Sequence, residues 1–441
     1  MDIRRVKLTD HKNATVLSND LIRAIIQDHN GRVIELSATN IHGGWVNCNK
    51  LHKFPFSKET VLQDVFNYDK TSRLTELLYG CQLHVEEINK KDIKIATKKI
   101  EDIEESIPNN LDAMELGDVL IERDLNSKKE NKNHFVESLF EADRVNWVVQ
   151  RYGSDQSTGG AWVLSVNDIS NKGNKWNAKR LEIIFPNQPV LYSVTYVKNI
   201  SNEELSIDMG FDNSLGSPLL ESGCVINSSA ALWRVAETAI KEVTNTRIVD
   251  NKKIFSLDKA PVENCSYSDI RIVPGIIGTT DVICGQNNPK DKMHQWISVI
   301  NPRQQMVYLS FTPGPDLTSS IDITLPYSNL VLDFGGRERQ PWSVYDGGTC
   351  NEFALHASHS TTNFGDNEGI ILAPGEIKRS MVGRALISYD NIRMGNNFYT
   401  FESFNHNIVL KRTKSNIVIP SDPKFEKVKK LCDRIIVFEN T

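Results

Sequence analysis

Short runs of β-branched and aromatic residues alternate with turn residues along most of the chain. Two such runs, 21–26 and 32–36, flank a turn in which Gly31 holds a position that favours a positive φ. Residues 190–197 follow the alternation of a half-buried antiparallel strand. Between about 140 and 400, similar runs recur at roughly 8–15-residue spacing, without strand–helix alternation. This pattern predicts a mainly β sandwich of antiparallel sheets.

Two segments depart from this pattern. Residues 52–135 are rich in Lys, Glu, Asp and Asn and contain helix-compatible stretches, so we expect an elaborated, partly helical insertion. Near the end of the chain, Asp422 can cap a helix and Pro423 suits a first helical position. We therefore predict one β domain over 1–410 and a C-terminal extension over 411–441 that contains a short helix.

Composition limits the class of protein. The chain has 441 residues, of which 39% are hydrophobic and 24% charged, as in an ordinary globular protein with a sizeable core. Its net charge of −5 argues against a nucleic-acid partner. The charged N-terminus and the lack of 18 consecutive apolar residues predict a cytoplasmic protein without a membrane contact. Seven scattered cysteines without a CxxC pair predict reduced thiols and no metal site.

Polar residues concentrate near three β segments, whereas P-loop, GxGxxG, HExxH and GxSxG patterns do not occur in the sequence. Residues 206–223 run into a corner bounded by Gly and Pro and present Asp212 and Asn213. Glu352 interrupts an otherwise apolar strand pattern. Residues 372–387 form an LAPGE turn followed by a final strand.

These segments, in this order, resemble the aldose 1-epimerase (galactose mutarotase) superfamily. The resemblance covers most of residues 15–390 outside the insertion, and the segments that carry it are the opening hairpin over 17–36, the segment 133–147, the strand VTYVKNISN over 194–202, the corner 210–220 and LAPGE over 372–376. It implies a β supersandwich of twisted antiparallel sheets with a concave binding face. It also implies an enzyme that interconverts sugar anomers without a cofactor.

The resemblance assigns roles to individual residues. In the family a glutamate takes the proton of the anomeric hydroxyl while a histidine protonates the ring oxygen. Glu352 falls where the family carries its glutamate, and Asp212 stands where the family corner carries histidine. An aspartic acid with its usual pKa near 4 needs burial or a nearby carboxylate to act as the acid. His356, four residues from Glu352 and of the same strand parity, is an alternative acid, as are His134 and His359.

His134 and His359 are also candidates for substrate binding, and three further residues join them. Asn213 adjoins Asp212 at the corner, Arg337 could bind a phosphate or carboxylate, and Trp342 could stack on a sugar ring. The alternatives are a charged hairpin tip for Arg337 and core packing for Trp342.

The proposed catalytic residues also have structural alternatives. Glu352 could be a solvent-facing or salt-bridged strand residue, and Asp212 could stabilise a turn. His356 and His359 could be surface polar groups beside a loop.

The sequence leaves three functions open. The first is an epimerase-like enzyme, and the second is a lyase, isomerase or cyclase that reuses the same scaffold. The third is a non-catalytic carbohydrate-binding protein. In each case the expected partner is a small sugar or sugar-like compound, and the protein is expected to be a monomer or homodimer.

Overall fold

The computed structural model contains several antiparallel β-sheets, which confirms the predicted mainly β fold. The structure describes residues 1–7, 13–28, 31, 33–48, 118–121 (backbone), 147–167, 176–207, 209–235, 246–249, 254–263, 265–275, 277–287, 294–334, 353–361, 370–390, 392, 400–412 and 415–438.

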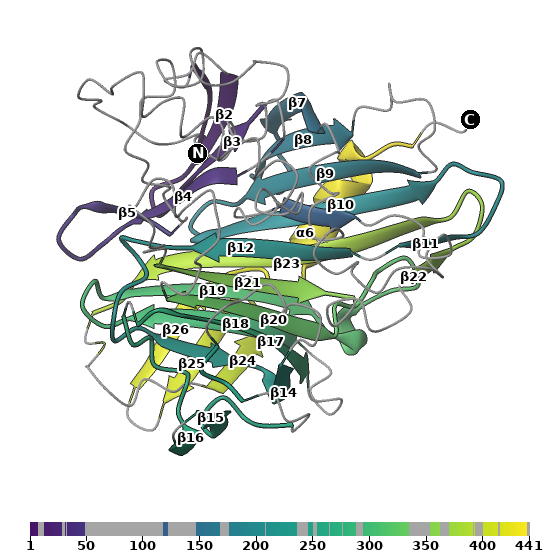
Figure 1. Ribbon diagram of the computed structural model, residues 1–441. Helices are drawn as coiled ribbons and strands as arrows, with labels where there is room; N and C mark the ends of the chain where they lie inside the picture. The colour runs from purple at the N-terminus through teal and green to yellow at the C-terminus, as the bar shows by residue number, and fades with distance from the viewer. Residues whose placement is uncertain are drawn as a thin grey trace, which may run out of the picture.

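The largest sheet has eight strands and forms the centre of the molecule (Figure 1). In spatial order its strands are β13 (Val225–Ser228), β18 (His294–Asn301), β19 (Met306–Pro313), β23 (Ile377–Ser388), β10 (Val190–Asn199), β9 (Trp176–Ile184), β8 (Ala161–Asn167) and β7 (Trp147–Ser154). β10 coincides closely with the run over 190–197 that the sequence identified. We call this sheet the central sheet.

A six-stranded sheet packs against one face of the central sheet (Figure 1). In spatial order its strands are β14 (Ala230–Val235), β17 (Thr279–Asn287), β20 (Tyr327–Phe334), β21 (Phe353–Ser360), β12 (Met209–Leu215) and β6 (Asp118–Ile121). Leu330 and Leu355 of this sheet share one buried apolar cluster with Leu191 and Val299 of the central sheet. We call the face that carries Leu330 and Leu355 the inner face, and the opposite face the outer face.

The N-terminal sheet adds to the same apolar cluster. It consists of β1 (Asp2–Lys7), β2 (Asn13–Ser18), β3 (Ile22–Gln27), β4 (Val33–Thr39) and β5 (Trp45–Asn47), joined as successive antiparallel neighbours. Gly31 lies between β3 and β4 with a φ of 63°, as the sequence predicted for the opening hairpin. Smaller pairs join β11 (Leu205–Ile207) to β22 (Ile370–Leu372) and β15 (Ala260–Val262) to β16 (Cys265–Ser268), and a 3-10 helix spans Pro315–Leu317.

The C-terminal segment covers the other face of the central sheet. It comprises β24 (Thr400–Phe404), β25 (Asn407–Arg412), β26 (Ser415–Pro420) and helix α6 (Glu426–Ile435). Ile408, Ile417 and Leu431 from this segment pack with Tyr192 and Phe311 of the central sheet in a second buried cluster.

The expected C-terminal helix is present but begins later than predicted. The Asp422 carboxylate accepts hydrogen bonds from the backbone N–H groups of Glu426, Lys427 and Val428, so it does stabilise the helix start. Pro423 precedes the helix instead of occupying its first position. The buried Phe425, at a φ of 57°, stands between them and delays the first helical residue.

Several other predictions concern residues that the structure describes only in part or not at all. Of the insertion 52–135, only the β6 backbone is described, and it pairs with β12 at an edge of the six-stranded sheet. The division of the chain at residue 410 stays a prediction. Four cysteines of the described part, Cys48, Cys224, Cys284 and Cys432, are buried. Within the described part, no helix has the length and apolar character needed to cross a membrane.

Candidate functional site

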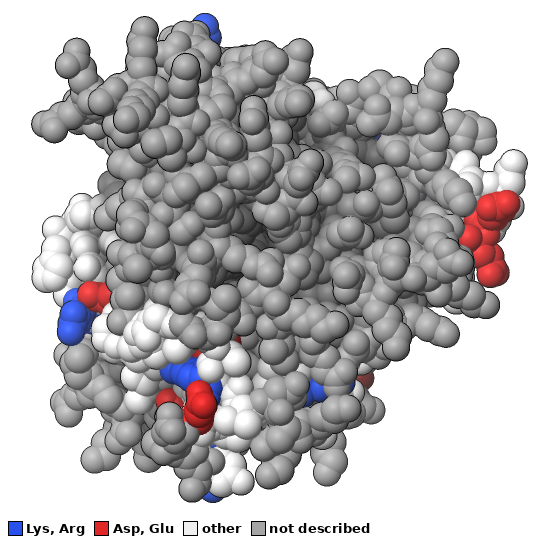
Figure 2. Space-filling view, in the orientation of Figure 1, with Lys and Arg blue, Asp and Glu red and all other residues white. Residues whose placement is uncertain are grey.

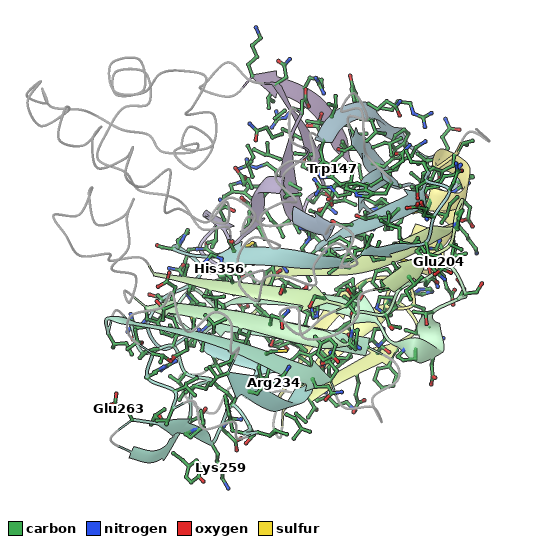
Figure 3. All side chains as sticks on the ribbon, turned by 45° about the vertical axis from the view of Figure 1, so that its right-hand side comes forward. Trp147, Glu204, Arg234, Lys259, Glu263 and His356 are labelled. Carbon is green, nitrogen blue, oxygen red and sulfur yellow. The ribbon has the colours of Figure 1, made fainter. Side chains whose placement is uncertain are left out.

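Strand register arranges polar residues in rows across the outer face of the six-stranded sheet. One row runs from Arg234 through Cys284 and Asn329 to Ser358. In the next row His356 lies between Val331 and Ser214, and in a third Ser360 lies beside Tyr327. We call this surface the outer polar face, defined by Ser214, Arg234, Asn329, His356, Ser358 and Ser360. Figure 3 shows His356 and Arg234 at separate points of this sheet.

The outer polar face carries a buried serine–histidine pair. Ser214 on β12 and His356 on β21 are directly opposite in the strand register, and Ser214 Oγ lies 2.8 Å from His356 Nδ1. Both side chains are buried. This hydrogen bond holds the imidazole ring in place through Nδ1.

Asp212 lies within a strand, not in a turn. Its backbone forms part of β12, pairs with Ser358 in the register, and precedes Ser214 by two residues. The turn interpretation was wrong because β12 continues to Leu215 before the Gly/Pro corner begins. Ser214, further along β12, lies on the outer polar face.

Asn213 has the opposite parity and is fully buried. Its amide nitrogen donates a hydrogen bond to the Ala357 carbonyl at 3.0 Å, across the β12–β21 pair. The structure therefore separates Asn213 from the outer polar face, although the sequence grouped it with Asp212.

His359 also faces inward. It lies on β21 three residues after His356, is fully buried, and pairs with Phe211 in the register. Burial lowers the pKa of His359 to about 4, and the backbone of Ser310 opposes this shift only in part. Both histidines belong to the interior of a strand, so the surface interpretation was wrong for each of them.

The remaining candidates cannot be placed. Glu352, His134, Arg337 and Trp342 lie outside the described residues. Glu352 immediately precedes β21 in the sequence.

The sequence patterns did not identify several polar residues of this face. Ser214 is one, and Asn329, whose side-chain nitrogen donates to Ser360 Oγ at 2.8 Å, is another. A signal was present in β21, where His356, Ser358 and Ser360 follow one another at every second position. That period of two places three polar side chains on one face of a strand.

The charge of the described surface is mixed. On the face seen in Figure 2, described acidic and basic side chains are interspersed toward the lower end, with a small acidic group at the right-hand edge. Among the described residues no group of three or more His, Cys, Asp or Glu side chains could hold a metal ion. The described polar groups of the outer polar face can donate and accept hydrogen bonds.

Comparison with solved structures identifies the fold. A galactose mutarotase-like protein from Clostridium acetobutylicum has a TM-score of 0.51 at 14% identity, covering 88% of this chain and 98% of that one. A candidate aldose 1-epimerase from Klebsiella pneumoniae also has a TM-score of 0.51, at 10% identity, covering 88% of this chain and 83% of that one. No protein-family model and no curated protein sequence matches the chain. At these identities the likeness shows a galactose mutarotase-like fold, as the sequence motifs implied.

Proposed function

We propose that the protein is a carbohydrate-active isomerase that interconverts the anomers of a sugar or sugar derivative on its outer polar face. The observation that carries this proposal is the buried Ser214–His356 pair, on a polar sheet face of a galactose mutarotase-like fold. The fold by itself does not define a reaction, whereas the residues of the site do.

In the proposed reaction His356 is the general acid. As an imidazolium, His356 donates its Nδ1–H to Ser214 Oγ and its Nε2–H to the ring oxygen of the sugar. A carboxylate takes the proton of the anomeric hydroxyl, the bond between C1 and the ring oxygen breaks, and an open-chain aldehyde forms. After rotation about C1–C2 the ring closes on the other face and both protons return.

Two carboxylates are proposed as the base. Glu352 is the residue that the family resemblance favours. Asp212 is the residue that the register favours, because it is diagonal to His356 across β12 and β21. Diagonal neighbours on one face of an antiparallel pair are about 7–8 Å apart, a distance that two groups acting on one sugar ring can bridge. Separate substitutions distinguish the two bases.

The test is anomer equilibration, followed by polarimetry or NMR exchange on a panel of aldoses and sugar phosphates. Wild-type protein is expected to accelerate equilibration of at least one of them. Glu352→Gln and Asp212→Asn are compared, and the true base is the one whose loss abolishes activity while the far-ultraviolet circular dichroism stays unchanged. A panel on which wild-type protein accelerates nothing would exclude the proposal.

The replacement of the family histidine by Asp212 favours a second candidate, a lyase, isomerase or cyclase on the same scaffold. Such an enzyme would bind a sugar-like compound and convert it without faster anomer exchange. Calorimetric binding with no conversion at all would instead indicate a carbohydrate-binding protein. A cytoplasmic location and a monomeric or homodimeric state are proposals from the sequence alone.

A further inference from the structure

Asn329 of the outer polar face has a hydrogen-bond acceptor that no described residue uses. Asn329 is only 5% exposed, and its Oδ1 has no hydrogen-bond partner in the part of the chain that the structure describes. Leaving a buried amide oxygen without a donor is destabilising, and folded proteins nearly always satisfy such atoms with a protein group or an ordered water. A water held at Oδ1 can be displaced by a ligand hydroxyl that makes the same hydrogen bond.

The other end of the same amide is held in place. Asn329 Nδ2 donates to Ser360 Oγ at 2.8 Å. In the strand register Asn329 is opposite Ser358, with Ser360 two residues further along β21 and His356 two residues before it. The amide oxygen and nitrogen leave one carbon in different directions. The bond to Ser360 therefore turns Oδ1 away from Ser360, toward the end of β21 that carries His356.

The spacing between Asn329 and His356 suits one sugar ring. The two residues are diagonal neighbours on one sheet face, across β20 and β21, so their side chains are about 7–8 Å apart. In the proposed reaction the ring oxygen of the sugar faces His356. The ring atom opposite that oxygen in a pyranose is C3. The C3 hydroxyl, which can donate a hydrogen bond, is then the group that reaches Asn329.

We propose that Asn329 is a specificity-determining residue whose Oδ1 accepts a hydrogen bond from the C3 hydroxyl of the sugar. Ser360 is a positioning residue, because it acts only by orienting the amide of Asn329. The substrates are thereby narrowed to sugars with a free hydroxyl at C3. This inference rests on the reaction proposed for the outer polar face, with the ring oxygen at His356.

A sugar without the C3 hydroxyl should be a poor substrate. It displaces the water and leaves Oδ1 buried without a donor, which is how binding sites reject analogues that lack a hydrogen-bonding group. The test compares D-glucose and D-galactose with their 3-deoxy and 6-deoxy forms. With wild-type protein, kcat/KM for anomer exchange should be about 10–100-fold lower for the 3-deoxy sugar than for its parent. The 6-deoxy sugar should react nearly as well as the parent.

Variants of Asn329 tie this discrimination to one atom. Asn329→Leu removes the acceptor at similar size and should leave the parent and 3-deoxy sugars within about twofold of each other, because the two losses are not additive. Asn329→Asp keeps an oxygen acceptor and should retain most of the discrimination. Asn329→Val gives the same comparison if the leucine variant does not fold, since valine is well accommodated in a strand. Full discrimination by a folded Asn329→Leu or Asn329→Val variant overturns the proposal.

Ser328, the preceding residue of β20, provides the matched control. Its buried Oγ also has no partner among the described residues, but its strand parity places it on the inner face. Ser328→Ala should therefore keep the wild-type discrimination between the parent and 3-deoxy sugars. Equal effects of Ser328→Ala and Asn329→Leu would show a general loss of packing and would overturn the proposed contact.

Calorimetric titration separates this inference from the proposed reaction. The full chain is titrated with the same sugars, so binding is measured whether or not anomers exchange. An affinity that depends on the C3 hydroxyl in the wild type but not in Asn329→Leu supports the role of Asn329, even if wild-type protein accelerates no exchange. An affinity that depends on this hydroxyl equally in both proteins, or in neither, overturns the role of Asn329 whatever the activity. Binding of neither parent sugar overturns it as well.

Discussion

The outer polar face and a buried group of charged residues in the central sheet lie on opposite sides of the six-stranded sheet and differ in how their polar groups are neutralised. The second group, which we call the interior polar cluster, consists of Arg180, Glu182 and Arg384. On the outer polar face, His356 pairs with the uncharged hydroxyl of Ser214. In the interior, Arg384 and Arg180 share the carboxylate of Glu182. Charged groups between two sheets need close opposite charges, because water cannot solvate them there. An imidazole and a serine hydroxyl can each donate or accept a hydrogen bond, so the Ser214–His356 pair forms without an opposite charge.

Replacing His356 should produce the largest loss of activity. Comparison with His359 tests the two faces of β21 separately. His356→Gln is expected to lower kcat/KM for anomer exchange by about 10²–10⁴-fold, the usual contribution of a general acid. His359→Gln, three residues away on the inner face, should lower stability while keeping most of the activity. Polarimetry and urea unfolding of both variants measure the two effects. Equal losses of activity would contradict the assignment of the outer polar face as the site.

Replacing Arg384 tests the interior side of the comparison. Arg384→Met should reduce the free energy of unfolding by about 3–5 kcal/mol, because it leaves the buried Glu182 with a weakened partner set. Adding Glu182→Leu should recover part of this loss, since both buried charges are then absent. Arg234→Met, on the outer polar face, is the matched control and should change unfolding by less than about 1 kcal/mol. Urea unfolding midpoints give all three values, and a neutral Arg384→Met would contradict the importance of the cluster.

Acid should destabilise the folded protein through its buried histidines. Burial lowers the pKa of His294 and of His359 from 6.5 to about 4, so the unfolded chain binds more protons between these values. Their contribution is therefore fully present above pH 6.5 and is lost as the pH falls toward 4. Between pH 7 and pH 5, each histidine should lower the free energy of unfolding by about 2 kcal/mol. Urea unfolding at both pH values measures this loss, which His359→Gln should reduce. A His359→Gln variant as acid-sensitive as the wild type would refute the prediction.

Removing the Ser214 hydroxyl should have the smallest effect on activity. It tests whether Ser214 acts on His356. Ser214→Ala is expected to lower kcat by about 3–10-fold, as the loss of one hydrogen bond of about 1 kcal/mol implies, and to change the pH dependence of kcat. Ser214→Thr should restore most of the rate because it keeps the hydroxyl. Ser360→Ala, on the same face but in another row, is the control for the pH dependence. A pH profile identical to that of the wild type would show that Ser214 does not act on His356.

The local pattern of the sequence was sufficient for much of the fold. Alternating apolar residues identified β10, and Gly31 marked the turn of the opening hairpin with its positive φ. Asp422 marked the start of the C-terminal helix through its three backbone hydrogen bonds. These features depend on neighbours within a few residues, which is why they can be read from the chain itself.

The candidate site was only partly predictable. His356 was selected from the sequence, and the structure places it on the outer polar face; Ser214, its hydrogen-bond partner, was missed because the two residues are 142 positions apart. Asn213 and His359 were also selected, yet their strand parity directs both toward the interior. Composition gives residue types but not the face of the sheet on which each residue lies.

By itself the sequence determined the strands, their turns and the motifs that resemble a sugar epimerase, because hydrophobic periodicity and turn chemistry are local. Only the tertiary structure decided the register of β12 against β21 and the packing of the six-stranded sheet on the central sheet. A shift of one residue in that register would exchange the two faces of each strand. The register thus decides that His356 meets Ser214 on one side of the sheet, while Arg384 and Glu182 meet in the interior on the other.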